Sequence, residues 1–339
     1  MKRVGILTGG GDSSGINKAI VTTVGMLVNA DIEAVGIQNG WQGLLDEKWD
    51  TLELESCRQW EYQPGTLLGT ARTNPFASGQ EQQLLTNLDR AQLDGLIAIG
   101  GDDTLSVAQR LSSLGVPIVG IPQTIDNDVY GTERCLGFDT ALHAIAQSVN
   151  SVRNSNNAHE RDMLVEVMGR ETGWLAILSA LLIGADYVLC PELNTSIDGL
   201  IERFRQRSSQ GCHSCVAVVA EGFDISSRSN MEIADDFGNF ELEGIAYSIA
   251  QLVGQRTRKK PRVLVMGYLQ RGGNPTPTDL LLATRFAARA VSSLVQGNTG
   301  TMTALRQGAI VDVPLTEVIG KKQYVTDQWL QLTSLELDL

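Results

Sequence analysis

Residues 3–12 read RVGILTGGGD, and residues 95–104 read GLIAIGGDDT. In both stretches a short apolar run, typical of a buried strand, enters a glycine turn that is followed by acidic residues and a helical pattern. Ligands of open α/β sheets bind beyond the carboxyl ends of the strands, where glycines and helix N-termini favour anions. We therefore expect the two glycine turns to form two halves of one phosphate-binding site.

Strand-like and helix-like segments alternate along the rest of the chain. Further strand-like runs occupy 33–37, 117–121, 165–169, 187–190, 216–222 and 262–267. Helical patterns of apolar residues follow Asp139 and Thr278. This alternation predicts an α/β fold with parallel sheets flanked by helices. Because 339 residues exceed the usual size of one hydrophobic core, we expect two lobes, with the chain crossing between them near 139 and near 270.

The composition narrows the class of protein. A formal net charge of −12 argues against nonspecific binding to nucleic acid or to an anionic membrane. No apolar run reaches the roughly 20 residues that cross a bilayer, and the opening MKRVGILTGGGD predicts a strand rather than a signal peptide. Five scattered cysteines are typical of a reducing compartment, so we expect a cytoplasmic protein.

The most specific segment is Pro122–Gln123–Thr124–Ile125–Asp126–Asn127–Asp128. If it is extended, alternation puts Thr124, Asp126 and Asp128 on one side, where two carboxylates and a hydroxyl suit proton abstraction from an alcohol. The alternative interpretation is a turn rich in Asp and Asn that has only a structural role, because such turns have the same composition. The acidic pair Asp102–Asp103 after the neighbouring predicted strand favours the catalytic interpretation, because a carboxylate near phosphates indicates a bridging Mg²⁺.

Arginines adjoin several of the predicted strand ends and glycine turns. Guanidinium groups at such junctions suit bidentate contacts to phosphate. The candidates are Arg72, Arg161, Arg170, Arg262 and Arg271. Glu221, at the end of another strand-like run, is placed to accept a hydrogen bond from a sugar hydroxyl.

In their order along the chain, TGGGD, GGDDT, PQTIDND, MGRETG, EGF and GYLQRGG resemble the motifs of the phosphofructokinases, from residue 3 to about residue 290. The resemblance implies Mg²⁺-dependent phosphorylation of the 1-hydroxyl of fructose 6-phosphate to fructose 1,6-bisphosphate, with ATP or pyrophosphate as donor. It also implies two α/β lobes with the active site in the cleft, and a homodimer or homotetramer with shared active sites. The donor-binding lobe would hold 1–139 plus 271–305, and the phosphosugar-binding lobe 140–270 plus 306–339.

The resemblance carries roles over to the matching positions. Asp126 would be the base, supported by Asp128 and Thr124, and Arg170 would stabilise the transition-state charge. Asp102 would bind Mg²⁺. The donor would be held by Gly11, Arg72, Asp103, Thr104 and Gln123. The sugar and its 6-phosphate would be held by Arg161, Met168, Gly169, Arg170, Glu221, Arg262, Tyr268 and Arg271, with Arg161 and Arg262 reaching from a neighbouring subunit.

Two positions bear on the donor. ATP users of the family usually have glycine where Asp103 stands, so this carboxylate would repel an α-phosphate while pyrophosphate still fits. Pyrophosphate users typically have lysine where Gln123 stands, so Gln123 gives no such support. We weight Asp103 more heavily and expect pyrophosphate rather than ATP.

Several alternatives stay open at this point. Tyr268 replaces a histidine of many relatives, so a related phosphosugar such as sedoheptulose 7-phosphate is a further possible substrate. A non-catalytic phosphosugar sensor could keep the arginines, although retention of the acidic residues favours an enzyme. Bacterial relatives bind effectors through arginines of the first helix, and this chain has Val21 and Gly25 there, so regulation by the same effectors is an open question. A dinucleotide-binding site is disfavoured because Ser14 stands where its fingerprint needs glycine or alanine.

Overall fold

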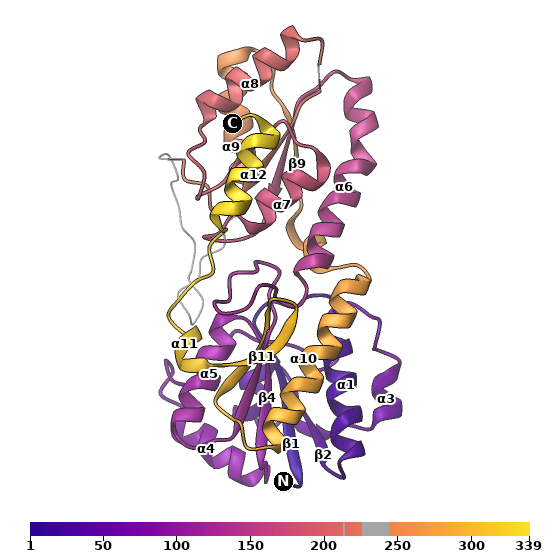
Figure 1. Cartoon of the computed structure of the whole chain (residues 1–339), viewed down its shortest axis with the longest axis vertical. Helices are drawn as coiled ribbons and strands as arrows, with labels where there is room; N and C mark the ends of the chain where they lie inside the picture. Colours follow the sequence, from indigo (N-terminus) through magenta and orange to yellow (C-terminus); the bar gives the residue numbers. More distant parts are fainter. Residues whose placement is uncertain (213, 226–243) are drawn as a thin grey trace. The chain divides into compact units, whose positions relative to one another are not determined.

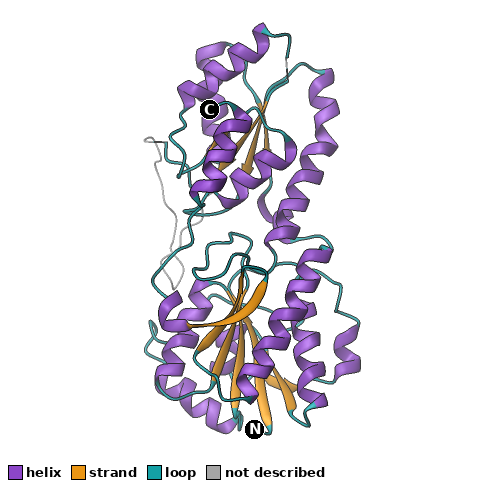
Figure 2. Cartoon of the chain, viewed as in Figure 1, coloured by secondary structure: helices purple, strands orange, loops and turns teal. Residues whose placement is uncertain are grey.

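The computed structural model describes residues 1–212, 214–225 and 244–339. The described chain forms two compact units, shown in Figures 1 and 2. The first unit contains Met1–Thr140 and Arg271–Lys322, and the second contains the described residues of 141–270 together with Gln323–Leu339.

The first unit is built on a seven-stranded sheet of order β11-β10-β5-β4-β1-β2-β3. Its strands are β1 (Arg3–Gly9), β2 (Glu33–Ile37), β3 (Trp49–Thr51), β4 (Gly95–Gly100), β5 (Ile118–Pro122), β10 (Thr301–Arg306) and β11 (Ala309–Pro314). The five inner strands run parallel, and the two edge strands pair antiparallel with their neighbours. The α/β fold with a mostly parallel sheet is therefore confirmed.

Helices cover both faces of this sheet (Figure 2). β4 is buried along its whole length, so apolar side chains on both of its faces need a helical layer. One layer contains α1 (Ile16–Asn29) and α10 (Pro277–Val295), which pack against each other. The opposite core is formed with α2 (Gly40–Leu45), α4 (Glu81–Arg90), α5 (Asp102–Ser113) and α11 (Leu315–Val318). The short α3 (Leu54–Arg58) packs on α1.

The second unit has a parallel four-stranded sheet of order β7-β8-β6-β9. Its strands are β6 (Met163–Val167), β7 (Tyr187–Leu189), β8 (Val216–Ala220) and β9 (Arg262–Val265). Its helices are α7 (Trp174–Ile183), α8 (Ile197–Ser209), α9 (Ile245–Thr257) and α12 (Asp327–Leu337). The long α6 (Phe138–Ala158) begins in the first unit, and the 3₁₀ turn η1 (Gly267–Arg271) ends there.

Two predicted helix starts are displaced by a few residues. Thr276, not a residue after Thr278, caps α10, because its hydroxyl accepts a hydrogen bond from the backbone N–H of Asp279 and Pro277 fits the first turn. The helical pattern predicted to follow Asp139 belongs to α6, which begins one residue earlier at Phe138 and has Asp139 in its first turn.

The structure also differs from the expected placement of residues 306–339 in the phosphosugar lobe. β11 pairs with β10 of the first sheet, so residues up to Lys322 belong to the first unit. The two strands are joined at Gln307 and Gly308, which both have positive φ (49° and 77°), the geometry of a tight hairpin turn. No helix in the described part of the chain combines the length and the hydropathy needed to cross a membrane.

Candidate active site

The glycine turn after β1 lets other chain segments come close. A Cβ atom on Gly9 would lie 2.5 Å from the hydroxyl of Thr104, near the start of α5. A Cβ atom on Gly11 would collide with the guanidinium of Arg271, which donates a hydrogen bond to the carbonyl of Asp12 at 3.0 Å. The structure thus places Arg271 on the predicted donor loop, whereas the resemblance assigns it to the sugar phosphate.

Gln123, directly after β5, is buried and also holds this turn. Its amide nitrogen donates to the carbonyl of Gly11 at 3.1 Å and lies 2.9 Å from the hydroxyl of Ser13. Its amide oxygen has no hydrogen-bond partner within the described residues. The amide is therefore used to fix the loop, and it brings no positive charge to the site.

The acidic pair predicted to meet the donor lies at the N-terminus of α5. Gly101 is the N-cap, and Asp102 and Asp103 form the first turn, where the helix dipole favours carboxylates. One oxygen of Asp102 accepts a hydrogen bond from the backbone N–H of Asp103 at 3.0 Å. Thr104, the next residue, is buried against the glycine turn.

Arg72 lies on the segment that runs alongside the glycine turn. The N–H of Gly10 donates to the carbonyl of Ala71 at 3.2 Å, and the hydroxyl of Thr70 donates to the carbonyl of Gly10 at 2.7 Å. Arg72 directly follows the two residues that make these bonds, and it is exposed.

The segment Thr124–Asp128 is a turn and is not extended, so the alternation argument from the sequence is wrong. Asn127 has φ 55°, a left-handed conformation that asparagine tolerates better than most residues. Thr124 and Asp126 are nevertheless in contact, because the hydroxyl of Thr124 donates to a carboxylate oxygen of Asp126 at 3.3 Å and accepts from its N–H at 3.1 Å. Asp126 and Asp128 are each only 6% exposed.

Three carboxylates lie close enough to Cys135 to affect the pKa of its thiol. Complete burial raises the pKa of the Cys135 thiol, and the negative charges of Asp128, Asp126 and Asp102 raise this pKa further. The electrostatic influence of all three on one thiol indicates that the predicted base, its neighbour and the predicted metal ligand share one region of the first unit.

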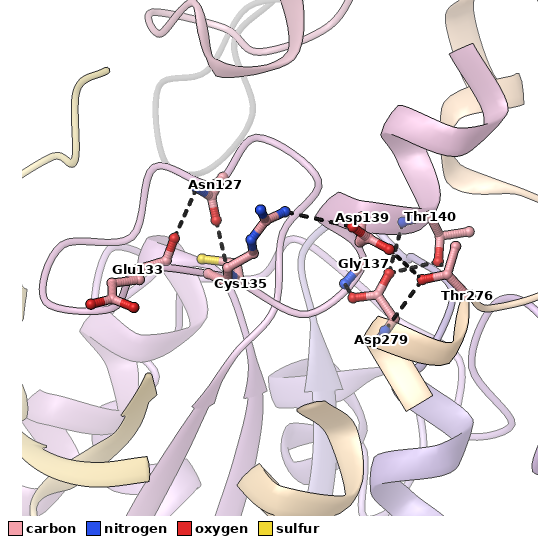
Figure 3. A network of polar contacts seen from close by, with 9 residues as sticks. Asn127, Glu133, Cys135, Gly137, Asp139, Thr140, Thr276 and Asp279 are labelled. Carbon is pink, nitrogen blue, oxygen red and sulfur yellow. Dashed lines mark hydrogen bonds and ion pairs between the residues drawn. The ribbon is translucent and has the colours of Figure 1, made fainter. Parts of the chain in front are cut away.

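A second polar network fixes the start of α6 (Figure 3). The carboxylate of Asp279 accepts hydrogen bonds from the N–H of Gly137 at 3.0 Å and from the N–H and hydroxyl of Thr140 at 2.8 and 2.6 Å. Thr276 donates from its hydroxyl to Asp139 at 2.7 Å. Burial raises the pKa of Asp279 to about 6, although these hydrogen bonds oppose the shift.

In the second unit, several predicted sugar-binding residues lie at the carboxyl end of the sheet. Met168, Gly169 and Arg170 follow β6, and the N–H of Arg170 donates to the carboxylate of Glu221, after β8, at 2.8 Å. Tyr268, 71% exposed, lies in η1 just after β9.

The sequence interpretation missed Gln270, which is buried within the same group of residues. Its amide oxygen accepts from the N–H of Met168 at 3.1 Å, and its nitrogen donates to the carbonyl of Gly267 at the same distance. Its position directly before Arg271 in the GYLQRGG motif is the one signal that could have pointed to it.

Arg161 and Arg262 lie at the other end of this sheet. Arg161 precedes β6, and its guanidinium donates to the carbonyl of Lys260 at 2.7 Å; Arg262 is the first residue of β9 and pairs in register with Met163, the first residue of β6. Because the strands are parallel, these arginines and Arg170 occupy opposite ends of the sheet. The unit by itself does not bring them together.

The comparisons with known proteins agree with the motifs. The family profile described as phosphofructokinase matches residues 3–294. The pyrophosphate--fructose 6-phosphate 1-phosphotransferase of Amycolatopsis methanolica is 39% identical over 330 residues, covering 95% of this chain and 96% of the relative. The ATP-dependent 6-phosphofructokinase of Oceanobacillus iheyensis is 34% identical over 340 residues, covering 100% of both.

The fold agrees as well. A crystal structure described as a pyrophosphate-dependent phosphofructokinase from Nitrosospira multiformis superposes with a TM-score of 0.83 at 21% identity, covering 96% of this chain and 86% of the other. The match of the family over most of the chain, the full-length relatives and the shared fold together show that this chain belongs to the phosphofructokinase family.

Proposed function

We propose that this protein transfers a phosphoryl group from pyrophosphate to the 1-hydroxyl of fructose 6-phosphate, giving fructose 1,6-bisphosphate and phosphate. The relatives include enzymes named for pyrophosphate and enzymes named for ATP, which supports the reaction but leaves the donor to the residues of this chain. The observation that carries the choice is Asp103, placed in the first turn of α5 directly after Asp102.

An aspartate at this position disfavours a third phosphate. Two negative groups brought together in a partly buried site repel each other unless a cation lies between them. Gln123 brings no cation, because its amide is neutral and is engaged with Gly11 and Ser13. Pyrophosphate has no α-phosphate and avoids this contact.

The acidic loop after β5 supplies the proton chemistry. Asp126 takes the proton of the 1-hydroxyl while that oxygen bonds to the terminal phosphorus of pyrophosphate and the bridging P–O bond breaks. Thr124 orients Asp126 through its hydroxyl, and Arg170 balances the charge of the transferring phosphoryl group.

Asp102 is the residue that would hold Mg²⁺. Mg²⁺ is usually bound by one or two protein carboxylates together with substrate phosphates, so a single carboxylate beside bound phosphate is a sufficient protein ligand. When bound, the ion would neutralise phosphate charge. The second oxygen of Asp102 carries no hydrogen bond within the described chain, which supports this role.

We further propose that Arg161 and Arg262 bind the sugar 6-phosphate of a neighbouring subunit, so that the enzyme is a homo-oligomer. Their position at the amino end of the second sheet, opposite to Met168–Arg170, supports action in another subunit's site.

ATP is the second candidate donor, supported by relatives named as ATP-dependent and by the absence of a lysine at Gln123. The test is a donor panel. Initial rates of fructose 1,6-bisphosphate formation would be measured with pyrophosphate, ATP or ADP, each with and without Mg²⁺. We expect turnover only in the assay that contains both pyrophosphate and Mg²⁺, and none with ATP or ADP. Efficient turnover with ATP and none with pyrophosphate would reject the proposed donor.

A further inference from the structure

We propose that Asn127 is a positioning residue for phosphoryl transfer, because its side-chain amide clamps the loop that carries Asp126 and Asp128 onto the return segment Glu133–Cys135. The inference rests on the proposed function for the roles of the two carboxylates. Asn127 lies between them in sequence and is 2% exposed, so its side chain points into the protein. In this role Asn127 acts through the position of the loop and does not contact the substrate.

The backbone at Asn127 sets the direction of the loop. Its φ of 55° reverses the chain between the two acids, and an asparagine meets this left-handed conformation at low cost. Glycine would adopt the same φ without strain. The backbone conformation and the side-chain contacts can therefore be tested separately.

The side chain makes two contacts of opposite polarity (Figure 3). Its oxygen accepts a hydrogen bond from the N–H of Cys135 at 2.8 Å, and its nitrogen donates to the carbonyl of Glu133 at 3.4 Å. Since one partner is a donor and the other an acceptor, the amide can serve both only in this orientation. An aspartate of the same shape would have no donor for the carbonyl of Glu133.

The return segment is itself fixed to the sheet. The N–H of Glu133 donates to the carbonyl of Leu305 at 2.9 Å, and the N–H of Leu305 donates to the hydroxyl of Thr132 at 3.0 Å. The guanidinium of Arg306 donates to the carbonyl of Gly131 at 2.8 Å. Asn127 therefore links the acidic loop to β10 through a segment that the sheet already holds.

A clamp matters here because the proposed function needs Asp126 and Asp128 in fixed positions, and Asn127 lies between them in sequence. Each of the two acids is 6% exposed, so the surrounding protein determines where its side chain lies. Catalysis by a positioned base depends on placement to a fraction of an ångström. Loss of the clamp should thus lower turnover more than it weakens substrate binding.

The experiment compares Asn127→Gly with Thr132→Val in the full-length protein. The glycine variant keeps the backbone conformation and removes both clamp bonds. The valine variant removes two hydrogen bonds of the same segment, the one that Thr132 accepts from the N–H of Leu305 and the one that it donates to the carbonyl of Arg134, and it leaves the side chain of Asn127 intact. For each protein, kcat, the KM of both substrates and the hydrogen exchange of backbone amides in 126–137 would be measured.

For Asn127→Gly we expect kcat to fall at least about 30-fold, both KM values to stay within about threefold, and amide exchange in 126–137 to accelerate about tenfold or more. For Thr132→Val we expect faster exchange at Leu305 and kcat within about twofold of wild type. Together these results would show that loss of kcat follows from loss of the Asn127 contacts and not from a general loosening of the segment.

Other outcomes overturn the proposal in distinguishable ways. Unchanged exchange in Asn127→Gly would mean that no clamp exists. Faster exchange with unchanged kcat would reduce Asn127 to a structural residue. An equal loss of kcat in both variants would show that the segment, rather than Asn127, matters. If wild type transferred phosphate from none of the donors, the proposed function itself would fail and the positioning role with it.

Discussion

The amide nitrogen of Gln123 lies 3.1 Å from the carbonyl oxygen of Gly11 and donates a hydrogen bond to it. Gln123 follows β5 and Gly11 follows β1, and β4 lies between these strands in the sheet. One neutral side chain thus joins the two strand ends on either side of the acidic pair at the start of α5. In the sequence, Gln123 is notable only as a neutral residue in the place of a lysine, whereas in the structure it holds the predicted donor loop.

Replacing Gln123 should therefore weaken donor binding. We expect Gln123→Ala to raise the KM for pyrophosphate about tenfold, because a buried hydrogen bond that shapes the loop is lost, and to leave the KM for fructose 6-phosphate unchanged. Gln123→Lys keeps a donor for Gly11 and adds a positive charge, so its KM for pyrophosphate should be at or below that of wild type. Pyrophosphate titrations of initial rate measure both, and equal KM values in all three proteins would contradict the role.

Asp126 should be essential for the chemical step. We expect Asp126→Asn to lower kcat by at least about 10²-fold with little change in either KM, because the amide keeps the size of the side chain but accepts no proton. The matched control is Asp139→Asn, which changes a nearby acid outside the proposed site and should keep near-wild-type kcat. Nearly normal turnover in Asp126→Asn would remove the residue from this role.

Asp103 should select the donor. Asp103→Gly removes both the charge and the volume, so we expect kcat/KM for ATP to rise and kcat/KM for pyrophosphate to fall. Asp103→Asn keeps the volume and removes the charge, and it should be intermediate if repulsion dominates. Donor selectivity, taken as the ratio of the two kcat/KM values, is the measurement. A ratio that stays constant across the three proteins would show that Asp103 does not face the donor.

The buried acid Asp279 should make stability depend on pH. Its pKa is raised by burial to about 6, so between about pH 4 and pH 6 the folded state binds more protons at this position than the unfolded state. The contribution of this group to stability is therefore largest at low pH and decreases as the pH rises toward 6, by about 3 kcal/mol in all.

Asp279→Asn isolates this effect, since it cannot ionise. The free energy of unfolding of wild type minus that of the variant, from urea titrations, should decrease from pH 4 to pH 7. A difference that is flat or that increases over this range would show that Asp279 is ionised in the folded state with a pKa near its ordinary value.

The proposed sharing of sites between subunits predicts complementation. Arg161→Ala and Asp126→Ala should each be inactive or nearly so, because one lacks a sugar-phosphate ligand and the other lacks the base. Mixed under conditions in which subunits exchange, they should recover activity, since a hybrid site can take Asp126 from one chain and Arg161 from another. Mass spectrometry of tagged chains checks the exchange. Hybrids that form without activity would place both residues in one chain's site.

The sequence predicted β1, β2, β4 and β5 because they are apolar runs close to glycines, but it missed the inner strand β10, TMTALR, in which threonines interrupt the apolar run. β4, GLIAIG, is the clearest case, and its bounds 95–100 are those of the predicted strand. β11 was missed because it lies at the edge of the sheet and is only partly buried, so it has no such run. Its hairpin signal, Gln307–Gly308, is weak beside the usual Asn–Gly or Asp–Gly turn.

The motifs of the sequence name the candidate site residues but do not give their geometry. Motif spacing pointed to Asp126, but a positive φ at Asn127 replaced the extended segment by a turn, and local sequence does not determine φ at an asparagine. The contact of Arg271 with Asp12 joins residues 259 apart in the chain, so only the folded protein shows it.

The bracing of the acidic loop by β10 has a consequence for biosynthesis. Thr132 and Leu305, which share a hydrogen bond, are separated by 173 residues. At about 5–20 residues per second, a ribosome needs roughly 10–30 s to synthesise the chain between Thr132 and Leu305. Throughout that interval the nascent chain has β5 without its neighbour β10, and an unpaired strand edge is a template for aggregation. We expect chaperone dependence to concentrate in this window, and slow translation between the two segments to lower the yield of active enzyme.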